Sequence, residues 1–186
     1  LDATAGLTVT SGGILMTPTV AANTVTIAGG TLTTPSADLV FHIWDNNAAS
    51  YLSVGSKVTG NVGVTKVGSG IVNIRSNGSN VAYNVAAGEL TFENIAGTAT
   101  NGITVQNAAI LSSSGDVITL GAPLTLKAGA TVRNNGAGTQ TWSGNVLLDG
   151  AAATQVTFNT TTPANNVPNG ITLTGVVSGT ADLVKT

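Results

Sequence analysis

A short pattern recurs along this chain at intervals of about 20 residues. Each copy has two apolar residues separated by one position, then a pair of small residues and a further apolar residue. The clearest copies begin at Leu7, Val25, Tyr83 and Ile103, a looser one begins at Leu124, and weaker ones begin at Val146 and Ile171. Recurrence at this interval indicates a repeat protein, in which one structural unit is stacked on the next.

The wide gap between Val25 and Tyr83 has room for further units, which we expect in residues 39–46 and 63–70. Within a copy the apolar residues alternate with other residues, a period of two that is typical of a β-strand, and the small pair marks a bend. One strand-corner-strand unit cannot cover its own apolar face, whereas stacked copies pair every strand with the next. We therefore predict an all-β fold, a parallel β-solenoid (right-handed β-helix) of about nine rungs with roughly 20 residues in each.

We expect residues 1–186 to form a single β-solenoid domain, as a segment of a longer repeat protein or as a subunit of a fibre. An antiparallel sandwich is the competing architecture, because Asn-Gly pairs such as Asn101-Gly102 also occur in hairpins. The strands of a sandwich have no reason to share one motif at a constant interval. The recurrence therefore favours the solenoid.

The composition excludes several classes of partner. Only 8% of the residues are charged, and six Lys and Arg with a net charge of −2 are too few for the phosphate contacts of a nucleic-acid-binding protein. No apolar run approaches the roughly 18 residues of a membrane span. The 30 Thr residues suit the exposed positions of stacked strands, where identical charges would repel one another.

One segment resembles a known family. Residues 64–90 follow a pattern that combines a Lys-x-Gly-x-Gly run and alternating apolar residues with a later Val-x-Ala-Gly-x-Leu run. The matching positions are Lys66, Gly68, Gly70, Val72, Ile74, Val85, Ala87, Gly88 and Leu90. The segment resembles the autotransporter-associated β-strand repeat, also called the passenger-associated transport repeat. Residues 28–32 look like the end of an earlier copy, and residues 175–186 look like the start of another.

This resemblance implies a non-enzymatic β-helical stalk or fibre segment of a bacterial extracellular or cell-surface protein, associated with export across the outer membrane. The predicted fold itself suggests the partners. The end rungs of a solenoid expose unpaired N–H and C=O groups, which template further strands. We expect the ends to continue into flanking repeats of the same polypeptide or into identical subunits stacked head to tail.

An enzyme acting on polysaccharide is the main catalytic alternative, because parallel β-helices also carry such enzymes. Their sites require clustered acids on adjacent rungs. Glu89 and Glu93 are the only acids that share a strand face at close spacing, and at about 13 Å they are too far apart for a paired site. His42, the single histidine, has few acidic neighbours. We expect no catalytic residue, no metal site and no cofactor.

A glycan-binding adhesin or phage tail-fibre module is the alternative function. Aromatic rings provide stacking platforms for sugars, and Trp44 and Trp142 are the candidate contacts. Tyr51 and Tyr83 could extend such a platform if one face gathered them. The proline-bearing segment 159–170 is expected to form an extended loop and a further place for partner contact.

Overall fold

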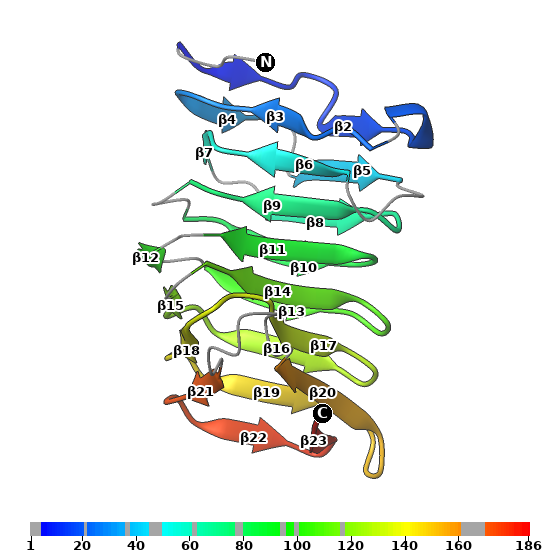
Figure 1. The fold of residues 1–186 in the computed structure, drawn as a ribbon, viewed down its shortest axis with the longest axis vertical. Coiled ribbons are helices and arrows are strands. Elements are labelled where there is room, and N and C mark those ends of the chain that lie inside the picture. The colour runs from blue at the N-terminus through cyan, green and yellow to red at the C-terminus, as the bar shows by residue number, and fades with distance from the viewer. Residues whose placement is uncertain are drawn as a thin grey trace.

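The computed structural model describes residues 5–20, 22–35, 38–44, 50–60, 63–76, 80–93, 96–98, 101–115, 118–160 and 170–186. In these residues the chain is all-β, and every strand pairing is parallel. Successive coils stack along the long axis, with the two ends of the chain near opposite ends of the rod (Figure 1). The parallel β-solenoid predicted from the recurrence is confirmed.

Two long sheets form two sides of the solenoid. The first long sheet consists of β2 (Gly13–Met16), β5 (Asp38–Ile43), β8 (Gly63–Val67), β10 (Ala82–Val85), β13 (Gly102–Val105), β16 (Leu124–Lys127), β19 (Val146–Asp149) and β22 (Val177–Gly179). The second long sheet consists of β3 (Val25–Ile27), β6 (Tyr51–Val54), β9 (Ile71–Ile74), β11 (Glu89–Glu93), β14 (Ile110–Ser114), β17 (Thr131–Asn134), β20 (Gln155–Thr160) and β23 (Asp182–Lys185). Eight strands in each described sheet correspond to eight coils, slightly fewer than the nine rungs predicted.

Shorter strands form the third side of the solenoid, along the left edge of Figure 1. These strands are β1 (Leu7–Thr8), β4 (Thr31–Thr33) and β7 (Lys57–Val58) in one sheet, and β12 (Ala96–Thr98), β15 (Ile118–Leu120), β18 (Thr139–Trp142) and β21 (Gly170–Leu173) in another. A short 3₁₀ turn, η1 (Pro18–Val20), lies between β2 and β3. A coil therefore runs from the third side to the first long sheet and then to the second long sheet.

The strand register supports the recurrence in the first long sheet. Tyr83, Ile103, Leu124 and Val146 are direct neighbours on consecutive coils, at intervals of 20, 21 and 22 residues. The two missing units lie where they were expected, because Leu39 pairs with Val64, and Val64 pairs with Tyr83.

Three of the predicted copies belong to other sides of the solenoid. Leu7 pairs with Leu32 on the third side, Val25 pairs with Leu52 in the second long sheet, and Ile171 pairs with Gln140 on the third side. Treating these copies as members of one series was wrong. The physical reason is that each side needs alternating apolar residues followed by a small corner, so the same local pattern arises on all three sides.

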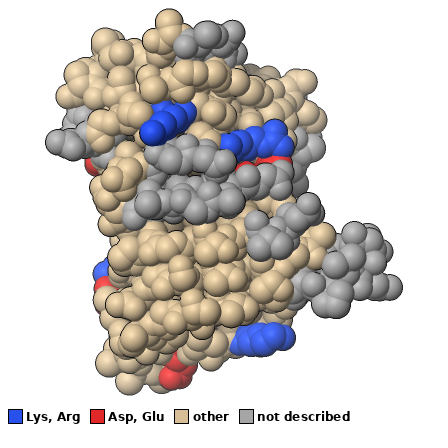
Figure 2. Space-filling view, turned by 90° about the vertical axis from the view of Figure 1, so that its left-hand side faces the viewer, with Lys and Arg blue, Asp and Glu red and all other residues tan. Residues whose placement is uncertain are grey.

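The interior is filled by columns of apolar side chains that continue from coil to coil. Leu52, Val72, Leu90, Leu111 and Val132 form one such column, and each is fully buried. Outside, Thr119, Thr141 and Thr172 align on consecutive coils of the third side. The side of the rod shown in Figure 2 carries only scattered charged groups. No described helix has the length and hydrophobicity needed to cross a membrane.

Candidate functional site

The segment that resembles a known repeat folds into a corner between the two long sheets, which we call the lysine corner (residues 66–70 and 86–90). Lys66 lies on β8, in register with Phe41 on the preceding coil and Val85 on the following one. Phe41 and Val85 are both fully buried, so Lys66 belongs to an interior apolar column. Its own side chain is also fully buried.

The Lys66 amine is held by backbone carbonyls of two coils. Its Nζ donates to the carbonyl oxygens of Val67 at 3.0 Å and Gly68 at 2.8 Å, both at its own corner. It also donates to the carbonyl oxygen of Ala87 at 3.0 Å, at the corner of the next coil. A buried cation is costly unless its donors are satisfied. Three acceptors use the full donor capacity of the ammonium group and connect the two coils.

Two glycines make this close approach feasible. Gly68 and Gly88 have φ angles of +83° and +68°, a backbone conformation that residues with a Cβ rarely adopt. A Cβ on Gly88 would overlap the carbonyl oxygen of Gly68, and it would lie 2.6 Å from that of Gly70 and 2.8 Å from the Lys66 amine. The glycines therefore keep the corners of successive coils within reach of one amine.

The remaining motif residues complete the corner. The Gly70 amide donates to the Ile43 carbonyl at 2.9 Å, and the Gly70 carbonyl accepts from the Glu89 amide at 3.2 Å, so corners of three coils are linked in series. Leu90 follows directly and is fully buried in the second long sheet. The structure thus brings together six of the nine motif positions matched in the sequence: Lys66, Gly68, Gly70, Ala87, Gly88 and Leu90.

Burial lowers the pKa of Lys66 from its ordinary value of 10.5 to about 8, and the negative charge of Glu89 opposes this shift in part. With a pKa near 8 the amine is largely protonated at neutral pH, which matches its three acceptors. Because the group is enclosed by its own corner, the arrangement is suited to stabilising two coils and not to presenting a nucleophile.

The other segments said to resemble the repeat occupy different places. Residues 28–32 run from the end of β3 into β4, through the corner from the second long sheet to the third side. Leu183 and Lys185 repeat the spacing of Val64 and Lys66, but they lie on β23 of the second long sheet. The sequence likeness of these segments therefore does not extend to equivalent structural positions.

The two tryptophans are not brought together. Trp44 follows β5, its side chain is about half exposed, and it lies against the lysine corner, since a Cβ on Gly68 would be 3.3 Å from its ring. Trp142 lies on β18 of the third side, in register with Leu120 and Leu173, and only 1% of it is exposed. Tyr83 is also interior, with its ring edge-on to Phe92 at 5.4 Å. Of these rings, only Trp44 offers substantial surface to a ligand.

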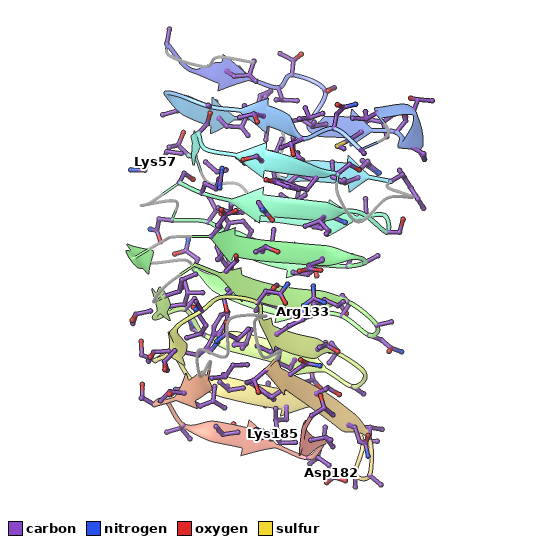
Figure 3. The ribbon with its side chains drawn as sticks, viewed as in Figure 1. Lys57, Arg133, Asp182 and Lys185 are labelled. Carbon is purple, nitrogen blue, oxygen red and sulfur yellow. The ribbon has the colours of Figure 1, made fainter. Side chains whose placement is uncertain are left out.

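Three of the described acidic residues form ion pairs between coils. Glu93 pairs with Arg75 and Asp149 pairs with Lys127 on neighbouring coils, and Glu89 pairs with Arg133 across two coil spacings. Arg133 lies on the second long sheet, as Figure 3 shows. Among the described residues, no three His, Asp or Glu side chains gather in a way that could hold a metal ion.

Sequence reasoning also missed Asn134, one of several further polar residues that are buried. Asn134 is fully buried, and its Nδ2 donates to the carbonyls of Gly138 at 2.8 Å and Gly170 at 2.9 Å. Its Oδ1 accepts from the Gly136 amide at 2.8 Å. The sequence signal was present, because Asn135-Gly136 marks a turn, but the role of the residue before it depends on the neighbouring coil.

The last coil leaves part of the interior open. Val177 and Leu183 pair with the buried residues Val146 and Val156, yet they are 42% and 46% exposed. A hollow of about 320 Å³ opens there, lined by Phe158, Thr160, Gly170, Ile171, Leu173, Leu183 and Lys185. Asp182 and Lys185 mark this end of the rod in Figure 3. Most of segment 159–170, the expected loop, lies outside the described residues.

Comparison of the chain with protein families, curated proteins and solved structures finds no match.

Proposed function

We propose that this chain is a structural, non-enzymatic β-solenoid segment that serves as a stalk or fibre of a bacterial extracellular or cell-surface protein. The observation that carries the proposal is the unbroken parallel register of the two long sheets, with eight strands in each. At about 4.8 Å per coil these strands span roughly 34 Å. The solenoid supports function through length and rigidity.

The contacts between coils support this role. The main chain pairs each coil with the next, apolar columns fill the interior, and the Lys66 amine joins two corners. The ion pairs of Glu89, Glu93 and Asp149 also join separate coils. These acids are engaged by cations and are not grouped as the carboxylate pair of a glycosidase would be. The location at a bacterial surface rests on the resemblance of residues 64–90.

The rod is tested by measuring the distance between its ends. The chain has no cysteine, so Thr8→Cys and Ser178→Cys place two spin labels on exposed positions of the first and last coils. We expect one narrow distance distribution by pulsed electron paramagnetic resonance, and a broad one in denaturant. A broad or multimodal distribution in buffer would contradict a rigid segment, and hydrolysis of a polysaccharide panel would contradict the non-enzymatic role.

A glycan-binding adhesin remains the second candidate function, and the half-exposed ring of Trp44 is the observation that favours it. If this candidate is right, a glycan array detects binding that Trp44→Ala removes. Leu147→Ala, which truncates another exposed apolar side chain, is the matched control and leaves that binding intact. Absence of binding to the array would exclude this alternative for the glycans tested.

A further inference from the structure

The outer face of the first long sheet carries a shallow hollow, which we call the Asp38 hollow. It lies over β5, β8, β10 and β13, and its volume is about 230 Å³. Its lining residues are Asp38, Gly63, Val64, Thr65, Ala82, Tyr83, Asn84 and Thr104. Each of these four strands has a paired strand on both sides. The hollow is therefore a feature of the side of the solenoid.

The hollow forms because two neighbouring outward positions carry little or no side chain. On β8 and β10, side chains of alternate residues face outward. Gly63 and Ala82 are outward neighbours in register, and they leave the main chain of both strands bare. Thr65 and Asn84 are the next outward pair, and Thr104 follows Asn84 in the same column on β13. The lining therefore combines bare main chain with hydroxyl and amide groups.

Asp38 closes one side of the hollow, and its carboxylate lies over the position of Gly63. The two residues are in register on β5 and β8, and a Cβ on Gly63 would be 2.5 Å from Asp38 Oδ1. Glu89, Glu93 and Asp149 each have a cationic partner. Asp38, by contrast, has no ion pair or hydrogen bond within the described ranges. Its oxygens are therefore available to accept hydrogen bonds from a ligand.

Asn84 supplies donors to the same hollow. Gln106 Nε2 donates to its Oδ1 at 3.0 Å, which engages the amide oxygen and fixes the orientation of the amide. The two N–H groups of Asn84 Nδ2 then remain for a ligand. The hydroxyls of Thr65 and Thr104, which both donate and accept, have no partner in the part of the chain that the structure describes. Acceptors, donors and hydroxyls thus line one hollow.

This set of groups matches the chemistry of sugar hydroxyls. Each hydroxyl both donates and accepts, so neighbouring hydroxyls of a sugar ring satisfy a carboxylate acceptor and an amide donor together. A hard cation such as Ca²⁺ takes about six to eight oxygen ligands, commonly from several carboxylates. Asp38 is the only charged side chain among the described lining residues, so an anionic ligand would be repelled without compensation. The hollow therefore favours an uncharged saccharide.

We infer that the Asp38 hollow binds one unit of a neutral saccharide. Asp38 accepts hydrogen bonds from the sugar hydroxyls, and Asn84 donates to them. The inference goes beyond the stalk function, and it gives the second candidate function a contact that does not involve Trp44. Asp38 begins β5 and Trp44 directly follows it, so the two residues are about 20 Å apart along the strand. A single sugar unit in the hollow therefore does not reach the tryptophan ring.

The experiment titrates the isotope-labelled chain with the methyl glycosides of glucose, galactose, mannose and N-acetylglucosamine, and follows amide shifts by two-dimensional NMR. Asp38→Ala removes the carboxylate, and Gly63→Ala places a Cβ where that carboxylate lies. Thr125→Ala is the matched control, because Thr125 continues the outward column of Thr104 but lies outside the lining. Circular dichroism and thermal melting establish that each variant keeps the wild-type fold.

We expect at least one of these glycosides to bind with a dissociation constant on the order of 1 mM, as suits a shallow site with few polar contacts. The backbone amides of Gly63 and Ala82 shift during the titration. Asp38→Ala and Gly63→Ala each weaken binding about tenfold or more, since a charge-assisted contact is lost or displaced. Thr125→Ala and Trp44→Ala leave the binding unchanged. Methyl glucuronide, which adds a carboxylate to the glucose unit, binds more weakly than methyl glucoside.

The inference is overturned if none of the four glycosides shifts the two amides, or if Thr125→Ala weakens binding as much as Asp38→Ala does. Binding that Trp44→Ala removes and Asp38→Ala preserves would place the sugar at the tryptophan and would also overturn it. Methyl glucuronide that binds as tightly as methyl glucoside would contradict the role of the carboxylate. The stalk function is judged separately, by the distance between the two spin labels.

Discussion

Two lysines of this solenoid face its interior columns, and they lie in opposite surroundings. Lys66 is fully buried between Phe41 and Val85, and three carbonyl oxygens accept hydrogen bonds from its amine. Lys185 pairs with Phe158 on the last coil, is exposed, and lines the open hollow. The difference shows that an interior position in a solenoid is created by the coils on both sides of it.

The same comparison explains why the resembling motif combines lysine with glycine. An interior lysine is tolerated only where carbonyls of its own corner and of the next one converge on the amine. Gly68 and Gly88 permit that convergence at the Lys66 position. On the last coil the second corner has no counterpart in the described chain. The motif is therefore a contact between two coils, which a single coil cannot complete.

The largest change in the free energy of unfolding is expected from a substitution that adds a Cβ at the lysine corner. Gly88→Ala forces a residue with a Cβ into a positive φ and into contact with the carbonyls of Gly68 and Gly70. We expect the free energy of unfolding to fall by about 4 kcal/mol, measured by chemical denaturation. Gly121→Ala is the control, because a Cβ at this position would have no neighbouring atom closer than 3.6 Å. In this variant the free energy of unfolding should fall by less than about 1 kcal/mol. Equal losses in both variants would contradict the account of the corner.

The next largest change in stability is expected when the two lysines are each replaced by methionine and compared. Lys66→Met keeps an apolar stem of similar length but leaves the corner carbonyls of Val67, Gly68 and Ala87 without the amine. We expect a loss of roughly 3 kcal/mol in dilute solution, since unsatisfied buried acceptors outweigh the relief of burying a cation. Lys185→Met, at the exposed end, should change the free energy of unfolding by less than about 0.5 kcal/mol. If Lys66→Met were more stable than wild type, the cost of burying the charged amine would exceed the cost of leaving the three carbonyls without a donor.

Much of the fold was predictable because its determinants are local. The copies at Tyr83, Ile103 and Leu124 have intervals close to 20 residues, and they stack as expected in the first long sheet. The assignment of copies to sides was not predictable from the pattern alone, and Leu7 and Val25 were placed in the wrong series. Where corners carry insertions, the interval grows, as between Val146 and Val177, which are 31 residues apart.

The candidate site was predictable as a set of residues but not as a set of contacts. The spacing of Lys66, Gly68 and Gly88 identified the motif, yet it did not show that the lysine is buried, because its acceptors include a carbonyl 21 residues away. Trp142 illustrates the reverse case. An aromatic ring on a Thr-rich strand suggests a surface contact, but its register with Leu120 and Leu173 places it inside.

The titration of Lys66 is expected to change the free energy of unfolding with pH by an intermediate amount. Its pKa of about 8 in the folded chain lies below the ordinary 10.5, so between these values the unfolded chain binds more protons. Raising the pH therefore favours the folded state. We expect wild type to gain about 2 kcal/mol relative to Lys66→Met between pH 7 and about 9.5, from parallel denaturation series. The difference between the two chains cancels the other titrating groups. If the difference in free energy of unfolding between wild type and Lys66→Met became smaller as the pH rises, the carbonyls would be raising the pKa of Lys66 above its ordinary value.

The smallest effect concerns a lysine that joins coils from the outside. Lys127 pairs with Asp149 on the next coil, and both side chains are well exposed, at 40% and 44%. Water screens such a pair, so Lys127→Met should cost no more than about 0.5 kcal/mol, and the cost should vanish in high salt. Denaturation at low and high ionic strength measures both values. A loss comparable to that of Lys66→Met would show that surface ion pairs hold the coils together as strongly as the buried corner does.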